Sequence, residues 1–464
     1  MAIWTPNLDG RRGPKYLQIV EAMAEDIASQ RLTEGARLPP HRILAYQLGI
    51  SANTTSRAYG EAVKRALLRG EVGRGTFVRS SDADPTAGVP GDLRRETRGP
   101  IDLSRNLPLP GFAEPHIRRV LGEISQDKCI PALLDYQTNK DLSHHIEAGR
   151  IWLNGCDVEA RADQIVPTMG GQHGLLCTLM ALLRPGDLLL TETLTYTPVC
   201  AMAERLGLHT ATIAMDADGV VPEDFAELCA RARPKAFYLT PTLQAPTTVT
   251  LSCQRRKAIA QIAERQNVIL IEDDVFAPLK ADRPAPIACL APEHTVYVTS
   301  LSKAVAPGLR VGFLYAPARL LPALRHTVNL SVWMTPPMTM EVAARLISDG
   351  TAAQLAIQQR VAAERRQSLA GSILADVEFA ADPQGFHLWI PLPKDWRADT
   401  FRAQCASHGV LVNEGRSFAP RAVDAPEAVR VCLSHEADET RVERGLRTLV
   451  NLIRLPPSLS AIEL

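Results

Sequence analysis

The spacing of apolar side chains predicts helices in the first eighty residues. Ile19, Met23 and Ile27 recur at four-residue steps, which is the pattern of an amphipathic helix that begins just after Pro14. The sequence Leu-Pro-Pro at residues 38–40 then breaks the chain, because proline lacks the amide hydrogen that a helix interior needs. A second, shorter apolar pattern follows and predicts another helix before the next glycine.

A third helix is predicted at about residues 52–68. Gly49 permits a tight turn before it, and Ser51 is placed to cap its first turn. Three glycines then accompany a short β-hairpin, and this order is that of a winged helix-turn-helix, a DNA-binding domain. The side chains suited to base edges and phosphates are Ser51, Asn53, Thr54, Thr55, Arg57 and Tyr59. A three-helix bundle with a solvated polar face is the alternative.

Short apolar runs alternate with helical stretches in the rest of the chain. They cover residues 187–190, 236–239, 268–271 and 295–298, and they predict an α/β fold with a largely parallel sheet. The segment between the two parts is rich in Ser, Asp, Pro, Gly and Arg, which is typical of a flexible linker. The predicted domains are therefore residues 1–80 and 101–464, joined by a linker at 81–100.

Charge is distributed unevenly along a chain whose formal net charge is zero. Residues 1–80 contain 12 Lys and Arg against 7 Asp and Glu, whereas the remaining residues contain 39 against 44. A basic small domain on an acidic body fits a polyanionic partner for the small domain alone.

Composition predicts a cytoplasmic protein without a membrane span, a metal site or a structural disulfide. No apolar run approaches the roughly 20 residues of a membrane helix, and the first ten residues do not resemble a signal peptide. The nine cysteines include no Cys-x-x-Cys pair, which is typical of scattered thiols in a reducing compartment.

Two predicted strands end in residues that are suited to chemistry. Asp273 follows the third apolar run, and Lys303 follows the fourth. Such a lysine can form a Schiff base with a pyridine aldehyde, while the acid pairs with the ring nitrogen. Ser300, Ser302 and Arg310 can bind a phosphate on the same ligand. From the residues alone, Lys303 is also compatible with a surface loop and Asp273 with a helix cap.

The segment from Ser300 to Gly312 resembles the lysine motif of fold-type-I pyridoxal-phosphate aminotransferases. It reads Ser-x-Ser-Lys, three residues, then Pro-Gly-Leu-Arg-x-Gly. The resemblance implies an aspartate aminotransferase fold with pyridoxal 5′-phosphate on Lys303. It also implies phosphate binding at Gly171 and Gln172, and ring stacking by Tyr196.

Arg430 is similar to the arginine of that family that binds a substrate carboxylate. It lies in Val-Arg-Val at residues 429–431. The alternative for Arg430 is a surface strand residue without a ligand.

The first domain resembles the GntR family of regulators. The landmarks are Tyr16-Leu17-Gln18-Ile19, Leu38-Pro39-Pro40-His41-Arg42, the turn at residues 49–54, and Gly75-Thr76-Phe77-Val78. Arg42 and Arg74 join the residues expected to contact DNA. The two domains together resemble the MocR-type regulators, which implies a homodimer arranged head to tail.

Four positions depart from these family patterns. Ala245 stands where the aminotransferases have an Asn that binds the phenolic oxygen of the cofactor, and Phe276 replaces a Tyr that touches the same oxygen. In the small domain, Ala52 replaces an Arg and His41 a Glu, so we expect DNA binding with an altered base preference. The loss of both phenolate donors is expected to harm transamination more than cofactor capture.

The expected function is a pyridoxal-phosphate-dependent DNA-binding transcriptional regulator. It senses a small amino compound, expected to carry a carboxylate, by transaldimination at Lys303. An active aminotransferase with an accessory DNA-binding domain is the alternative, and a repressor whose large domain only dimerises is a third reading.

Overall fold

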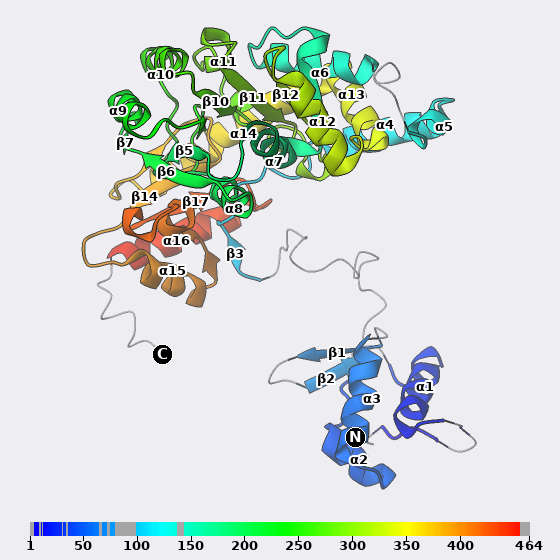
Figure 1. Ribbon diagram of the computed structural model, residues 1–464. Helices are drawn as coiled ribbons and strands as arrows, with labels where there is room; N and C mark the ends of the chain where they lie inside the picture. Colours follow the sequence, from blue (N-terminus) through cyan, green and yellow to red (C-terminus); the bar gives the residue numbers. More distant parts are fainter. Residues whose placement is uncertain are drawn as a thin grey trace. The chain divides into compact units, whose positions relative to one another are not determined.

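The computed structural model describes residues 4–8, 11, 13–29, 31–33, 36–64, 67–71, 75–78, 99–136 and 143–454. The chain divides into two compact units, one covering residues 1–94 and the other residues 95–464 (Figure 1). Most of the predicted linker lies outside the described residues.

The small unit contains three helices and a hairpin, as the sequence predicts. The helices are α1 (Lys15–Ala28), α2 (His41–Leu48) and α3 (Ala52–Lys64), and strands β1 (Leu68–Glu71) and β2 (Gly75–Val78) pair in antiparallel fashion. Gly49 ends α2 in the left-handed conformation, with φ of 62°, which explains why a glycine stands at this turn. The third helix is shorter than predicted, because Leu68 begins the hairpin.

A seven-stranded sheet forms the centre of the large unit, in the order β4-β12-β11-β10-β9-β5-β6. The strands are β4 (Ile165–Thr168), β5 (Leu188–Glu192), β6 (His209–Ile213), β9 (Ala236–Leu239), β10 (Ile269–Asp273), β11 (Thr295–Ser300) and β12 (Gly312–Tyr315). The predicted largely parallel arrangement holds: six strands run in one direction, and β12 alone among the seven runs antiparallel to its neighbours β4 and β11.

Helices cover both faces of this sheet, which explains why most of the strand residues are buried. Leu189 packs against one layer, which includes α7 (Gly170–Leu182), α8 (Pro198–Arg205) and α12 (Leu321–Val332). Its neighbour Leu190 points to the opposite layer, which includes α9 (Pro222–Ala232), α10 (Cys253–Gln266) and α11 (Ile287–Leu290). The alternation follows from the two-residue period of a strand.

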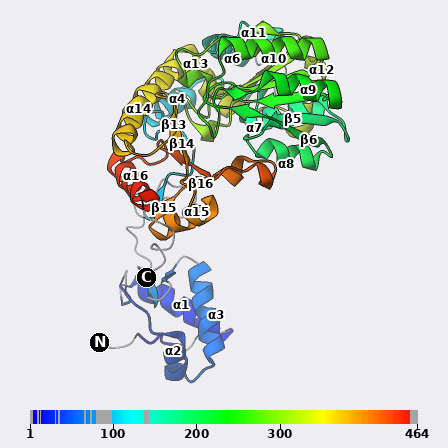
Figure 2. The same cartoon turned by 90° about the vertical axis from the view of Figure 1, so that its left-hand side faces the viewer.

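Further helices pack around one end of the sheet (Figures 1 and 2). They are α4 (Glu114–Gln126), α5 (Ile130–Leu133), α6 (Ser143–Gly155), α13 (Pro337–Ser348) and the long α14 (Thr351–Ile373). Two short strands, β7 (Met215–Asp216) and β8 (Gly219–Val220), form a separate hairpin.

A smaller four-stranded sheet follows α14, in the order β13-β14-β17-β16. The strands are β13 (Ala380–Ala381), β14 (His387–Pro391), β16 (Asn413–Glu414) and β17 (Ala428–Cys432), and they pack with α15 (Ala398–Ser407) and α16 (Glu439–Arg454). The first strand of the large unit, β3 (Ile101–Asp102), pairs with β15 (Val410–Leu411). The residues that follow the predicted linker are thereby held against this smaller sheet.

None of the helices in the part of the chain that the structure describes combines the length and the apolar character of a membrane span.

Candidate functional site

Lys303 lies in a half-buried position one turn beyond the end of β11. The strand is wholly buried, and its parallel neighbour β10 ends at Asp273, so both residues lie at the same edge of the sheet. Nζ of Lys303 donates a hydrogen bond to the main-chain oxygen of Asn106 at 2.6 Å and lies 5.2 Å from the centre of the Phe276 ring. Burial, with the nearby charge of Arg430, lowers the pKa of Lys303 to about 8.

Asp273 keeps one carboxylate oxygen available at this edge. Its Oδ2 accepts a hydrogen bond from the Tyr238 hydroxyl at 2.7 Å, whereas its Oδ1 is buried and has no partner among the described residues. Burial raises the pKa of Asp273 to about 6. Its neighbour Glu272 instead accepts from two main-chain amides at the start of α11. Asp273 is therefore the acid that can serve a cationic ring nitrogen.

A cradle of glycines and hydroxyls surrounds the start of α7. Gly170 has φ of 78°, and a Cβ added there would lie 2.7 Å from the Arg310 guanidinium. A Cβ on Gly171 would lie 3.8 Å from Oγ of Ser300, which in turn accepts from the Ser302 amide at 3.3 Å. The amides of a helix start with an arginine and a hydroxyl beside them suit a phosphate.

Gln172 and Tyr196 lie next to this cradle. Both side chains are exposed, and the Tyr196 hydroxyl donates to Oε1 of Gln172 at 3.4 Å. The structure thus brings together all the residues predicted to bind the cofactor. The unpaired oxygen of Asp273, the glycines at the start of α7 and the half-buried Lys303 fit a phosphorylated pyridine aldehyde.

Arg430 is 8% exposed, so its interpretation as a surface strand residue is wrong. Strand β17 lies between β14 and β16 in the small sheet. Arg430 on this strand is close enough to Lys303 for its charge to lower the pKa of the lysine. The guanidinium donates to the main-chain oxygen of Ser104 at 2.8 Å and lies 4.6 Å from the Phe418 ring centre. Its Nε has no partner, and no acidic residue in the described ranges pairs with it. A buried cation without a counter-ion is expected to attract an anion.

Asn106 and His387 also lie at this site, and the sequence did not predict either of them. Asn106 is 8% exposed, and its amide nitrogen lies 3.2 Å from Nδ1 of the fully buried His387. Nε2 of His387 lies 3.3 Å from the main-chain oxygen of Gln244. No spacing pattern joins residues 106, 303, 387 and 430, because only the tertiary fold brings them together.

Two of the four departures from the family patterns lie at this site. Phe276 is buried against Lys303 and offers no hydrogen-bond donor. Ala245 follows Gln244, whose main-chain oxygen faces His387, so this segment also borders the pocket.

The predicted DNA-contacting residues divide into an exposed group and a buried pair. Arg42, Ser51, Asn53 and Arg57 are exposed, and Thr54 is half-buried. Oγ of Ser51 accepts from the amide of Thr54 at 3.2 Å, which is the predicted cap. Arg74 lies outside the described residues.

Thr55 and Tyr59 instead hold the small unit together, which corrects the expectation that they contact DNA. Thr55 is fully buried and donates to the main-chain oxygen of His41, whereas the Tyr59 hydroxyl donates to the main-chain oxygen of Pro39 at 2.7 Å. The exposed face of α3 contains Asn53, Ser56 and Gly60, and the three- and four-residue spacing of these positions could have identified Ser56.

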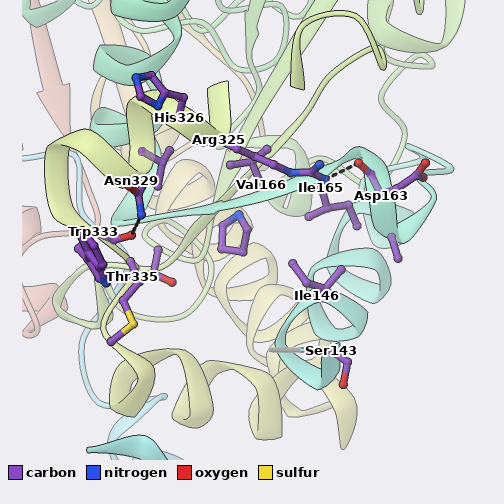
Figure 3. A pocket seen from close by; sticks show the side chains of 14 residues that line it. Ser143, Ile146, Asp163, Ile165, Val166, Arg325, His326, Asn329, Trp333 and Thr335 are labelled. Carbon is purple, nitrogen blue, oxygen red and sulfur yellow. Dashed lines mark hydrogen bonds between the residues drawn. The ribbon is translucent and has the colours of Figure 1, made fainter. Parts of the chain in front are cut away.

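A separate open hollow of about 870 Å³ lies between α6, β4 and α12 (Figure 3), and Lys303 is not among the residues that line it. Arg325 donates to the main-chain oxygen of Asp163 at its rim, and Asn329 donates to that of Trp333. Trp333 is 61% exposed, and its ring lies edge-on to that of Tyr136, which is 76% exposed. Two large exposed aromatic rings of this kind are typical of an interaction surface.

The described residues include one group with the composition of a metal site, formed by His144, His145 and Glu341. Both imidazoles lie within 3.0 Å of one Glu341 oxygen, while the other oxygen accepts from Arg345 at 2.7 Å. The carboxylate is therefore already paired with a cation. All nine cysteines are free thiols.

Comparison with known proteins identifies the family. The model of aminotransferase class I and II matches residues 130–449, and the model of bacterial regulatory proteins of the gntR family matches residues 15–78. The chain belongs to the aminotransferase class I and II family and carries a GntR helix-turn-helix domain, the combination found in MocR-type regulators. Membership implies pyridoxal 5′-phosphate as the cofactor.

Two relatives and one solved structure illustrate the similarity. The chain is 28% identical to the uncharacterized HTH-type transcriptional regulator YdeF of Bacillus subtilis (strain 168), over 97% of this chain and 96% of that protein. It is 24% identical to the probable rhizopine catabolism regulatory protein MocR of Rhizobium meliloti, over 76% of each. An archaeal alanine:glyoxylate aminotransferase superposes with a TM-score of 0.72 and 22% identity, covering 78% of this chain and 93% of that one.

Proposed function

We propose that this chain is a DNA-binding transcriptional regulator that senses a small amino compound by transaldimination at Lys303. When bound, pyridoxal phosphate supplies an aldehyde carbon that bonds reversibly to amines. Asp273, the glycines at the start of α7 and Arg310 would hold this group beside Lys303. The effector's amine would add to that carbon before Lys303 leaves it, and Lys303 would take the proton that the incoming ammonium gives up.

The observation that carries the proposal is that two side chains able to carry a positive charge, the half-buried Lys303 and the buried Arg430, donate to the same segment. Nζ of Lys303 donates to the main-chain oxygen of Asn106, and Arg430 donates to that of Ser104, two residues earlier. An amino acid has an amine for the first site and a carboxylate for the second. We infer that the effector carries both groups, since a guanidinium binds a carboxylate with charge-assisted hydrogen bonds.

The same segment offers a route for the signal. It follows β3 and the predicted linker, and an effector that binds Lys303 and Arg430 replaces the hydrogen bonds these residues make to it. Effector binding thereby changes the stability of the segment that continues toward the DNA-binding domain. An effector can shift DNA affinity only if it binds more tightly to one of two domain arrangements that differ in their affinity for DNA.

Two residues at the site favour sensing of an amine over catalytic turnover. Phe276 faces Lys303 with an apolar ring, and Ala245 has a methyl group, so neither can donate to the cofactor's phenolic oxygen. An active aminotransferase is the second candidate, because Lys303, Asp273 and Arg430 are all in place.

We further propose that the protein acts in the cytoplasm as a homodimer arranged head to tail, with α3 in the major groove of operator DNA. The dimer is supported by the exposed rings of Tyr136 and Trp333, which a second copy would cover. The exposed face of α3 and the basic excess of residues 1–80 support the DNA partner.

Visible absorbance of the purified protein, titrated with a panel of primary amines, tests the proposal. A coloured protein whose spectrum and operator affinity both respond to an amino acid supports the regulator. Sustained conversion of the amino acid over many turnovers supports the aminotransferase, and a colourless protein that binds DNA supports a large domain that only dimerises.

A further inference from the structure

Asn106 presents two oxygens next to Lys303. The main-chain oxygen accepts from Nζ of Lys303 at 2.6 Å. The side-chain Oδ1 is buried and has no hydrogen-bond partner among the described residues. A buried acceptor without a partner is unfavourable, so it is expected to be satisfied when a ligand is bound.

His387 fixes the direction in which this side chain points. Nε2 of His387 faces the main-chain oxygen of Gln244, which only accepts, so Nε2 carries the hydrogen. Nδ1 is then the acceptor, and it takes a hydrogen bond from the amide nitrogen of Asn106. Burial, with the charge of Arg430, lowers the pKa of His387 to about 3, which keeps the ring neutral. Oδ1 of Asn106 is therefore the atom turned away from His387.

An incoming amine needs acceptors in this pocket. At neutral pH it arrives as an ammonium ion, and the pocket already contains the side chains of Lys303 and Arg430. Oδ1 of Asn106 is a neutral acceptor beside the lysine. Once the lysine nitrogen is displaced, it also needs an acceptor, and the main-chain oxygen of Asn106 lies within reach.

We propose that Asn106 is the amine-binding residue of this site: its two oxygens hold whichever of the two amines, effector or Lys303, is not bonded to the cofactor. The inference rests on the proposed amine exchange at Lys303 and assigns its docking position. It also gives His387 a role, which is to orient Oδ1 of Asn106.

The experiment uses the full-length, cofactor-loaded protein with methylamine as the probe, because methylamine lacks the carboxylate that Arg430 would bind. The half-saturating concentration and the limiting rate of the absorbance change are measured. Asn106→Ala should raise the half-saturating concentration about tenfold or more, the effect of losing one hydrogen bond to a charged group, and leave the limiting rate within about twofold.

Two further variants separate amine binding from a structural role. Asn106→Asp keeps the acceptor oxygens but cannot donate to Nδ1 of His387, so methylamine affinity should match or exceed that of the wild type. Asn413→Ala removes a hydrogen bond of 2.9 Å to the main-chain oxygen of Ser104 and loosens the same segment without touching the acceptor. Its half-saturating concentration should stay near that of the wild type.

Equal methylamine affinity in Asn106→Ala and the wild type would overturn the inference. A loss of methylamine affinity in Asn106→Asp or Asn413→Ala as large as that in Asn106→Ala would also overturn it. The conformation of the segment, and not Oδ1 of Asn106, would then determine the affinity. A loaded wild-type protein that does not respond to methylamine overturns both this inference and the amine exchange. A wild-type response that Asn106→Ala leaves intact overturns the inference alone.

Discussion

Arg430 donates a hydrogen bond of 2.8 Å to the main-chain oxygen of Ser104 in a pocket where the structure describes no acidic partner for it. The Phe418 ring, 4.6 Å from the guanidinium carbon, supports the cation from one side. A neutral carbonyl and an aromatic face do not neutralise a buried charge. The arrangement therefore suits a guanidinium that receives an anionic group of a ligand.

Arg430→Lys is expected to weaken the response to a carboxylate effector. A lysine cannot reproduce bidentate binding, so the effector concentration for half response should rise about tenfold or more, the equivalent of roughly 1.5–3 kcal/mol. Titration of the visible spectrum with amino acids and with matched amines that lack a carboxylate measures this. Arg444→Lys, at an exposed position of α16, is the control. Equal responses of the wild type to both kinds of amine would contradict the assigned role.

The pH dependence of cofactor capture should reflect the lowered pKa of Lys303. Only the neutral amine attacks an aldehyde, and its fraction rises with pH through the pKa of about 8. The rate at which the cofactor-free protein binds pyridoxal phosphate should therefore increase from pH 7 and level off above about pH 9. Arg430→Gln removes a nearby positive charge and should move the midpoint upward. A midpoint near the usual lysine value in the wild type would contradict the lowered pKa of Lys303.

Restoring the two missing donors should change the electronics of the bound cofactor. In the double variant Ala245→Asn/Phe276→Tyr, both new side chains can donate to the phenolate and stabilise its ionised form. The pKa detected by absorbance of the Lys303-bound cofactor should fall, and turnover of amino acids should improve. An unchanged titration curve would show that these two positions do not border the phenolic oxygen.

Substitutions in α3 should separate DNA contact from folding. Arg57, whose guanidinium lies over the Tyr16 ring at 4.0 Å, is exposed, and Arg57→Ala should weaken operator binding by about 1–3 kcal/mol if it reads a base. If it contacts only phosphate, the loss should be similar for all sequences, with a smaller salt dependence. Tyr59→Phe should instead lower the unfolding free energy by about 1 kcal/mol and leave the sequence preference intact. Full operator affinity at every salt concentration in Arg57→Ala would refute placement of this face in the groove.

The sequence predicted the fold where local patterns decide it. Four-residue spacing located α1, and the buried runs located β9, β10 and β11, because periodicity and burial are recorded in consecutive residues. The antiparallel direction of β12 could not be predicted, since a short buried strand has the same composition in either direction. The same holds for Thr55 and Tyr59, whose polar groups suggest a surface until the main-chain oxygens that they bind are known.

The candidate site likewise contains residues that the sequence predicted and residues that only the structure reveals. Lys303, Asp273 and Arg310 lie at or near strand ends in recognisable motifs, so the sequence and its resemblance to the aminotransferases predicted them as site residues. Asn106 and His387 belong to no motif in the sequence. Their importance arises from a hydrogen-bonded contact across 281 residues of chain, which only the tertiary structure reveals.

The central claim is that amine binding at Lys303 controls DNA affinity, and a paired titration of wild type and Lys303→Ala tests it most directly. Visible absorbance and operator affinity are measured in the same samples as an amino acid is added. The account predicts that both signals of the wild type change with one midpoint. Lys303→Ala should lack the visible band and show constant operator affinity, while its thermal stability shows that it is folded. An amino acid that alters the operator affinity of Lys303→Ala as much as that of the wild type would contradict the claim.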